Sequence, residues 1–129
     1  MSDQKQRILL VDDDPSVLKV YTKRLEVAGY DVRWAVDGEE ALDRVREQPP
    51  DLIILDIMMP KLNGYEVCAR LKQGRTTSHI PIISFTAKGQ PKDRMAGMPL
   101  GADAYISKSC SAEVLLEQIK AMLSRSPSA

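Results

Sequence analysis

The chain has 129 residues, 43% of them hydrophobic, which suits one domain with a buried core and is too short for two domains of ordinary size. Its 18 Lys and Arg residues balance its 18 Asp and Glu residues, so the charge predicts no surface for DNA, RNA or an anionic membrane. Two cysteines without metal-ligand spacing, a polar start (MSDQKQR) and no apolar run long enough to span a bilayer predict a cytoplasmic protein without a membrane partner.

The first predicted strand covers residues 7–12 and runs directly into three acids, Asp12, Asp13 and Asp14. Asp14 followed by Pro15 is typical of a helix start, because the carboxylate caps free N–H groups and proline lacks an N–H that would need a partner. The apolar stripe of this helix consists of Leu18, Tyr21, Leu25 and Ala28, and Gly29 ends it. The pattern predicts a strand followed by a helix that packs on the sheet.

The next two strands differ in their hydrophobic pattern. Residues 30–36 alternate between apolar and polar side chains, which is typical of an edge strand with one wetter face. Asp37 to Glu40 then carry a capping-box pattern that predicts a second helix. In contrast, Leu52 to Leu55 are all apolar, which predicts a central strand buried on both faces, and this strand delivers Asp56 at its end.

The second half of the chain continues the alternation. A short helix after Gly64 is expected to turn Val67, Cys68 and Leu71 inward, and a fourth strand covers residues 80–85. A fourth helix over residues 91–98 is expected to be weak because of its glycines and the proline that follows it. A fifth strand over residues 102–107 ends at Lys108, and Ser111 caps a last helix whose inward face carries Leu115, Ile119 and Met122. Alternating strands and helices predict a doubly wound α/β domain with a parallel sheet.

Four of the five predicted strands end in residues suited to phosphoryl chemistry, namely Asp12 with Asp13, Asp56, Thr86 and Lys108. Ligands of open parallel sheets bind at the carboxyl ends of the strands, so these side chains should converge. Three crowded carboxylates repel one another, and an all-oxygen site of this kind favours Mg²⁺ as the neutralising cation. An Asp56 oxygen is then placed to attack phosphorus, while Lys108 neutralises phosphoryl oxygens and Thr86 hydrogen-bonds one of them.

At these residues the chain resembles the receiver domains of two-component response regulators, the CheY-like family, over residues 7–123. The resemblance implies a five-stranded parallel sheet of order 2-1-3-4-5 with helices on both faces, and residues 1–6 and 124–129 as flexible termini. It implies Asp56 as phosphoacceptor in a site with Asp12, Asp13 and the Met58 backbone carbonyl as further Mg²⁺ ligands, Asp12 acting mainly through water. Thr86 and Tyr105 resemble the switch pair of the family.

The resemblance also implies partners. The phosphoryl donor would be the phosphohistidine of a sensor kinase or of a histidine phosphotransfer protein. A downstream protein would bind the face made by the fourth helix, the fifth strand and the last helix, with no direct contact to nucleic acid. The chain would not be an enzyme in the ordinary sense, but a switch that assists its own phosphorylation and dephosphorylation.

Two other functions are weighed against this one. A receiver-like scaffold that is never phosphorylated is suggested by Ser109, where the family usually has proline after the lysine, and by Pro99 near the fourth helix. A Mg²⁺-dependent phosphohydrolase also uses an aspartyl-phosphate. The phosphohydrolase is disfavoured because Met58, two residues after Asp56, cannot serve as a general acid or base.

Overall fold

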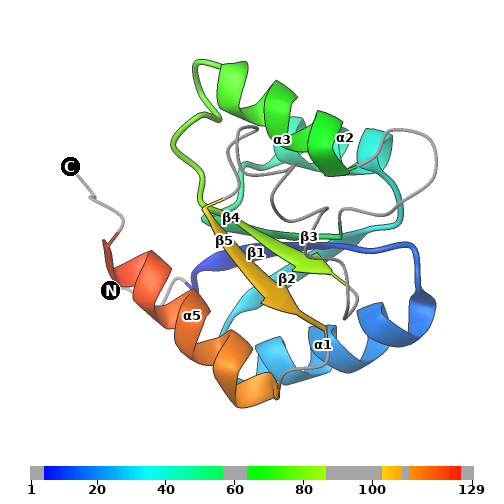
Figure 1. Ribbon diagram of the computed structural model, residues 1–129, viewed down its shortest axis with the longest axis vertical. Coiled ribbons are helices and arrows are strands. Elements are labelled where there is room, and N and C mark those ends of the chain that lie inside the picture. The colour runs from blue at the N-terminus through cyan, green and yellow to red at the C-terminus, as the bar shows by residue number, and fades with distance from the viewer. Residues whose placement is uncertain (1–4, 57–63, 87–102, 109–110, 126–129) are drawn as a thin grey trace.

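The computed structural model describes residues 5–56, 64–86, 103–108 and 111–125, and within these ranges it forms one α/β sandwich (Figure 1). The five parallel strands lie in the order β2-β1-β3-β4-β5, as predicted. Helices α2 and α3 cover one face of the sheet, and α1 and α5 cover the other (Figure 1). The strands are β1 (Arg7–Val11), β2 (Asp31–Ala35), β3 (Leu52–Leu55), β4 (Ile82–Thr86) and β5 (Ala104–Ser107). The helices are α1 (Pro15–Val27), α2 (Gly38–Glu47), α3 (Gly64–Gln73) and α5 (Ala112–Arg125).

Two predictions are not tested by the structure. The fourth helix predicted over residues 91–98 lies outside the described residues. The domain limits at residues 7 and 123 stay a prediction. Within the described ranges, no helix is long and apolar enough to cross a membrane.

The centre of the sheet follows from the apolar runs in the sequence. All four residues of β3 are fully buried, and β3 pairs with β1 on one side and β4 on the other. Because successive side chains of a strand point to opposite faces, these strands feed two separate cores. Ile8, Leu10, Leu52 and Ile54 face α1 and α5, whereas Leu9, Val11, Ile53 and Leu55 face α2 and α3. Each fully buried Leu or Ile side chain contributes about 1.5–3 kcal/mol to the stability of the folded state. The two cores therefore fix the positions of β1 and β3.

The helices begin and end close to where the sequence predicts. The Asp14 carboxylate accepts a hydrogen bond from the Ser16 N–H at 2.9 Å, with Pro15 as first residue of α1. Gly29 ends the turn after α1 with a φ of +105°, a left-handed value that favours glycine. One assignment was wrong: Ala28 was placed on the buried stripe of α1, but it is exposed because it is the C-cap residue, beyond the last helical turn.

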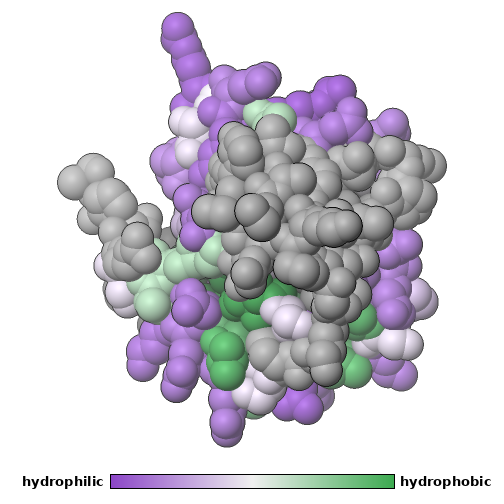
Figure 2. Space-filling model, viewed as in Figure 1, coloured by the Kyte–Doolittle hydropathy of each residue, from purple (hydrophilic) through white to green (hydrophobic). Residues whose placement is uncertain are grey.

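The other helices carry their predicted inward faces. Val67, Cys68 and Leu71 of α3 are buried, as are Leu115, Ile119 and Met122 of α5. The Ser111 hydroxyl accepts a hydrogen bond from the Val114 N–H at 3.3 Å and caps α5. In Figure 2, which shows the molecule from the same side as Figure 1, apolar residues gather mainly in the lower half of the visible surface, where α1 and α5 lie in Figure 1. These two helices also carry the exposed side chains of Val20, Val27 and Val114.

At the amino ends of β4 and β5, one lysine ties three segments together. The Lys72 ammonium group, near the end of α3, donates hydrogen bonds to the carbonyl oxygens of Ser78 and Ile80 at 3.2 and 3.1 Å. It also pairs with the Asp103 carboxylate at 3.1 Å, and the same carboxylate oxygen accepts the Ile82 N–H at 2.8 Å. We call this set, Lys72, Ser78, Ile80, Ile82 and Asp103, the Lys72 tie. It holds the starts of β4 and β5 against α3.

Candidate functional site

Two of the predicted acids follow neighbouring strands at the carboxyl edge of the sheet. Val11 of β1 pairs with Leu55 of β3, so the next residues, Asp12 and Asp56, stand side by side. The backbone of each is held by the adjacent strand: the Asp56 N–H donates to the Val11 carbonyl at 2.9 Å, and the Asp12 N–H donates to the Ala35 carbonyl at 3.1 Å. The main chain therefore fixes both acids.

The three predicted carboxylates form one cluster. Each of Asp12, Asp13 and Asp56 offers a carboxylate oxygen, and these three atoms lie within 4.8 Å of one another. Asp12 is fully buried and Asp56 is only 4% exposed, whereas Asp13 is exposed. Buried carboxylates are costly unless a cation or hydrogen-bond donors compensate them. The cluster therefore requires positive charge, and the exposed Asp13 leaves it open to solvent on one side.

Lys108 supplies positive charge to this cluster. Its ammonium nitrogen lies 2.8 Å from an Asp12 carboxylate oxygen and 3.3 Å from an Asp56 carboxylate oxygen. Burial lowers the pKa of Lys108, but the hydrogen bonds and negative charges of Asp12 and Asp56 outweigh it, so the pKa of Lys108 is raised above the ordinary lysine value. The lysine is therefore charged at neutral pH and bridges the two buried acids.

Asp12 is held through both carboxylate oxygens. One oxygen accepts the Asp14 N–H at 2.9 Å, and the other pairs with Lys108. The orientation of this carboxylate is thus set by the loop that starts α1 and by the residue that follows β5. The sequence pattern did not predict that Lys108 would bridge Asp12 and Asp56, because a lysine after a strand carries no mark of the acid it will contact.

The remaining predicted residues are described only in part. Thr86 ends β4 and pairs in register with Ser107, which places its backbone beside the strand that leads to Lys108. Tyr105 lies in β5 and pairs in register with Ser84. The side chains of Thr86 and Tyr105, and all of Met58, lie outside the described residues, so their roles stay predictions.

A parallel sheet of this order, with three carboxylates and a lysine at its carboxyl edge, defines the CheY-like class of receiver folds. The chain belongs to the response regulator receiver domain family, which matches residues 8–120. It is thus a receiver domain of two-component systems, as the motif predicted, and the family is not one of classical enzymes.

Relatives of known description agree with this assignment. The chain is 43% identical over 119 residues to RpaA of Synechocystis sp., described as a DNA-binding dual master transcriptional regulator, with 92% of this chain and 49% of RpaA covered. It is 45% identical over 121 residues to PhoP of Bacillus subtilis, the alkaline phosphatase synthesis transcriptional regulatory protein, with 94% of this chain and 50% of PhoP covered. The chain therefore spans about half the length of these relatives.

A solved structure shares the fold closely. The signal receiver domain of a signal transduction histidine kinase from Syntrophus aciditrophicus superposes with a TM-score of 0.90 at 34% identity, covering 96% of this chain and 94% of that one.

One prediction about partners was wrong. The balanced charge excluded nucleic acid as a partner, but RpaA is described as DNA-binding, and both relatives are transcriptional regulators. The net charge describes only these 129 residues, whereas each relative has about twice the length of the shared region. A charge balance over the shared region gives no information about what the longer relatives bind.

Proposed function

We propose that Asp56 accepts a phosphoryl group from the phosphohistidine of a sensor kinase or of a phosphotransfer protein. An Asp56 carboxylate oxygen forms the new bond to phosphorus as the phosphorus–nitrogen bond breaks, and the histidine keeps the electron pair of that bond and gains a proton. The observation that supports this proposal is the position of Asp56, fixed by the Val11 carbonyl at the carboxyl edge of the central strand beside a charged lysine.

Mg²⁺ is the cation we propose for the acid cluster. Its fit rests on the donor set: three carboxylates with one oxygen each within 4.8 Å, one of them exposed so that an ion can enter. When bound, Mg²⁺ would neutralise phosphoryl oxygens during transfer. Asp13 and Asp56 would be ligands, and Asp12, whose two oxygens already contact the Asp14 N–H and Lys108, would act through water.

Lys108 has a second task in this proposal. Before transfer it compensates the buried charges of Asp12 and Asp56. Once Asp56 carries a phosphoryl group, the same ammonium would pair with a phosphoryl oxygen, which carries more negative charge than the carboxylate. Thr86 would hydrogen-bond another phosphoryl oxygen and Tyr105 would respond to its movement, while the Met58 carbonyl would complete the Mg²⁺ ligands.

The test is phosphorylation by a small donor. Incubation with acetyl phosphate and Mg²⁺ should add the mass of one phosphoryl group to the intact protein, and excess chelator should prevent it. Asp56→Asn and Asp13→Asn should give no adduct, whereas Asp31→Asn, which changes an exposed acid of β2 outside the site, should behave like the unchanged protein. A full adduct on Asp56→Asn would refute the assignment of the phosphoacceptor, and a full adduct in chelator would refute the metal.

We further propose that the output of the switch is control of transcription, because RpaA and PhoP are transcriptional regulators. In cells that make this protein, Asp56→Asn should then change the abundance of a defined set of transcripts, and Asp31→Asn should not. An unchanged set of transcripts in Asp56→Asn cells would refute this output while leaving the chemistry of Asp56 untouched.

A further inference from the structure

A groove runs between α1 and the edge strand β2, on the side of β2 away from α2. It encloses about 800 Å³. Its apolar surface comes from Pro15 and Leu18 of α1 and from Trp34 and Val36 at the end of β2. Trp34 is 46% exposed and Val36 is 40% exposed, so large apolar side chains remain in contact with water. A contiguous exposed patch of this kind marks an interaction site more often than single exposed apolar residues do.

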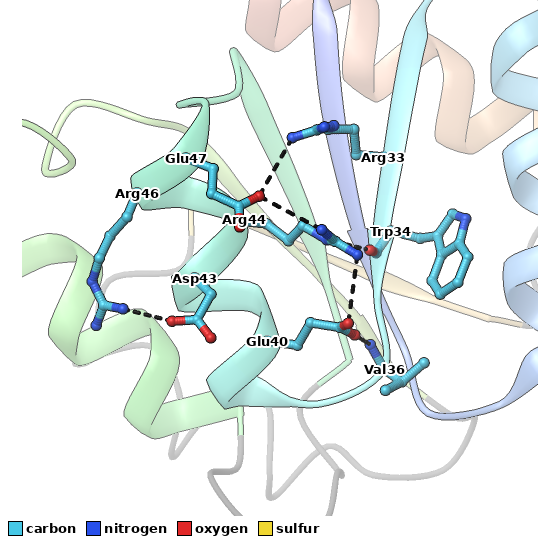
Figure 3. Close-up of polar contacts among 8 residues, drawn as sticks. All are labelled: Arg33, Trp34, Val36, Glu40, Asp43, Arg44, Arg46 and Glu47. Atoms are coloured by element: carbon cyan, nitrogen blue, oxygen red, sulfur yellow. Dashed lines mark hydrogen bonds and ion pairs between the residues drawn. The ribbon is translucent and has the colours of Figure 1, made fainter.

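The outer edge of β2 is partly occupied by side chains of α2. Asp31 and Ala35 bond inward to the segment of β1, so the backbone groups of Trp34 and Val36 point outward. Figure 3 shows that side chains of α2 bond one backbone group of each residue: the Arg44 Nε–H donates to the Trp34 carbonyl at 3.3 Å, and the Glu40 carboxylate accepts the Val36 N–H at 2.7 Å. Arg44 and Glu40 also pair with each other at 3.5 Å. Two of the backbone groups that an added strand would need at these positions are therefore already bonded.

The rim of the groove carries two positive charges that no carboxylate of the described residues pairs with. Lys19 and Lys23 line it one helical turn apart. Neither forms an ion pair within residues 5–56, 64–86, 103–108 and 111–125, although Arg33 of β2 and Arg44 and Arg46 of α2 each contact a carboxylate (Figure 3).

Thr22 lies on the same wall of the groove as these lysines. Its hydroxyl oxygen is shielded from water and has no hydrogen-bond partner among the described residues. The wall thus offers two cations beside an apolar floor, whereas the buried Thr22 hydroxyl is not accessible to a ligand.

We propose that this groove binds an amphipathic helix of a partner protein, whose apolar stripe lies on Trp34 and Val36. The two lysines select carboxylates at positions i and i+4 along one flank of that helix, because these positions are separated by the same turn as Lys19 and Lys23. Glu26, at the far end of the same wall, selects a basic residue one or two turns further on. A helix suits the groove better than an added strand, because Arg44 and Glu40 already bond two of the outward backbone groups of β2, and a helix needs none of them.

The groove also borders the phosphoryl site. Pro15 directly follows the loop of Asp12 to Asp14, and the carbonyl of Ala35, next to Val36, accepts the Asp12 N–H. A helix in the groove would therefore contact the two segments that hold Asp12. The binding itself needs no phosphoryl group, so it can be tested apart from the proposed phosphorylation.

The test uses synthetic peptides and the fluorescence of Trp34, the single tryptophan of the chain. The first peptide is a 14-residue helix, about 21 Å long, with a leucine stripe and glutamates at i and i+4 on one flank. The second carries lysines in place of those glutamates, and the third has a central proline that breaks the helix. We expect saturable binding of the first peptide with a change in Trp34 emission, and binding at least about tenfold weaker for the other two.

Variants of the protein locate the site. Lys19→Glu with Lys23→Glu, and Val36→Asp alone, should each weaken binding of the glutamate peptide by about tenfold or more. The matched controls are Lys120→Glu and Val114→Asp on α5, the latter at a valine that is 45% exposed, and both should bind like the unchanged protein. Urea midpoints establish that each variant is folded.

Three results would overturn the proposal. Equal binding of the proline peptide would mean that the groove does not require a helix, and equal binding of the lysine peptide would mean that its charge does not select acids. Concentration-dependent dimerisation that Val36→Asp abolishes would show that a second copy of the chain, not a partner helix, occupies the groove.

Discussion

Replacing Lys108 with methionine measures how much its ammonium group stabilises the folded protein by compensating the charges of the buried acids Asp12 and Asp56. The change removes ion pairs of 2.8 Å to Asp12 and 3.3 Å to Asp56 and keeps an apolar stem of similar length. At an effective dielectric constant of about 20, each pair is worth on the order of 5 kcal/mol before the cost of desolvation. Removing one partner of a fully buried pair costs about 3–5 kcal/mol, because a charge is left without compensation. The Lys108 side chain is 23% exposed, so we expect a smaller loss, about 2–3 kcal/mol in the free energy of unfolding.

Urea unfolding without divalent cations is the assay. The midpoint of Lys108→Met should fall by roughly 1 M, while the matched variant Lys120→Met, at an exposed lysine of α5, should shift little. Mg²⁺ should then stabilise Lys108→Met more than the unchanged protein, since the cation no longer competes with an ammonium group for Asp12 and Asp56. A Lys108→Met midpoint equal to that of Lys120→Met would refute the view that the lysine compensates the buried acids.

Three further predictions concern pH and the helix termini. The folded-state pKa of Lys108 is raised, so its stabilising contribution should be complete below the ordinary lysine value of about 10.4 and disappear as the pH rises through the raised value. The difference in urea midpoint between the unchanged protein and Lys108→Met should therefore stay constant from neutral pH to about pH 10 and shrink above it; a constant difference at higher pH would contradict the ion-pair geometry. Asp37→Ala removes the carboxylate that accepts the Glu40 N–H at 2.8 Å and should cost about 1 kcal/mol in chemical denaturation, whereas a cost near zero would mean that water caps α2 equally well. Gly29→Ala forces a side chain into a φ of +105° and should cost about 1–2 kcal/mol by the same assay, although nothing lies within 4 Å of the new methyl group; an unchanged midpoint would mean that the turn relaxes.

The hydrophobic pattern of the sequence was sufficient to predict the layers of the fold and the edge of the sheet at which the site lies. Leu52 to Leu55 have no polar interruption, and only a strand covered on both faces by helices buries four such residues completely. Once that strand is central, the acids after β1 and β3 must meet, because parallel strands end at the same edge. The cluster of Asp12, Asp13 and Asp56 is thus a consequence of strand length and direction.

The contacts that individual side chains make within the fold could not be predicted in the same way. The capping-box pattern of Asp37 to Glu40 predicted the start of α2, but it did not specify that the Glu40 carboxylate would accept the Val36 N–H. Val36 follows an edge strand, so its N–H has no neighbouring strand to bond, and the Glu40 carboxylate satisfies it. Lys108 is a similar case, since its two carboxylate partners follow β1 and β3, far away in the chain. Such contacts depend on tertiary distances that local patterns do not encode.

The Lys72 tie has a consequence for the position of the site lysine. Asp103 is bound to Lys72 and to the start of β4, and at the other end of β5 Ser107 pairs in register with Thr86. The strand β5 is therefore held at its start by a side-chain contact and at its end by its pairing with β4. Lys108 directly follows Ser107, so both attachments fix the point from which its side chain reaches Asp12 and Asp56. The lysine of the site is thus positioned from the opposite edge of the sheet as well as from its own.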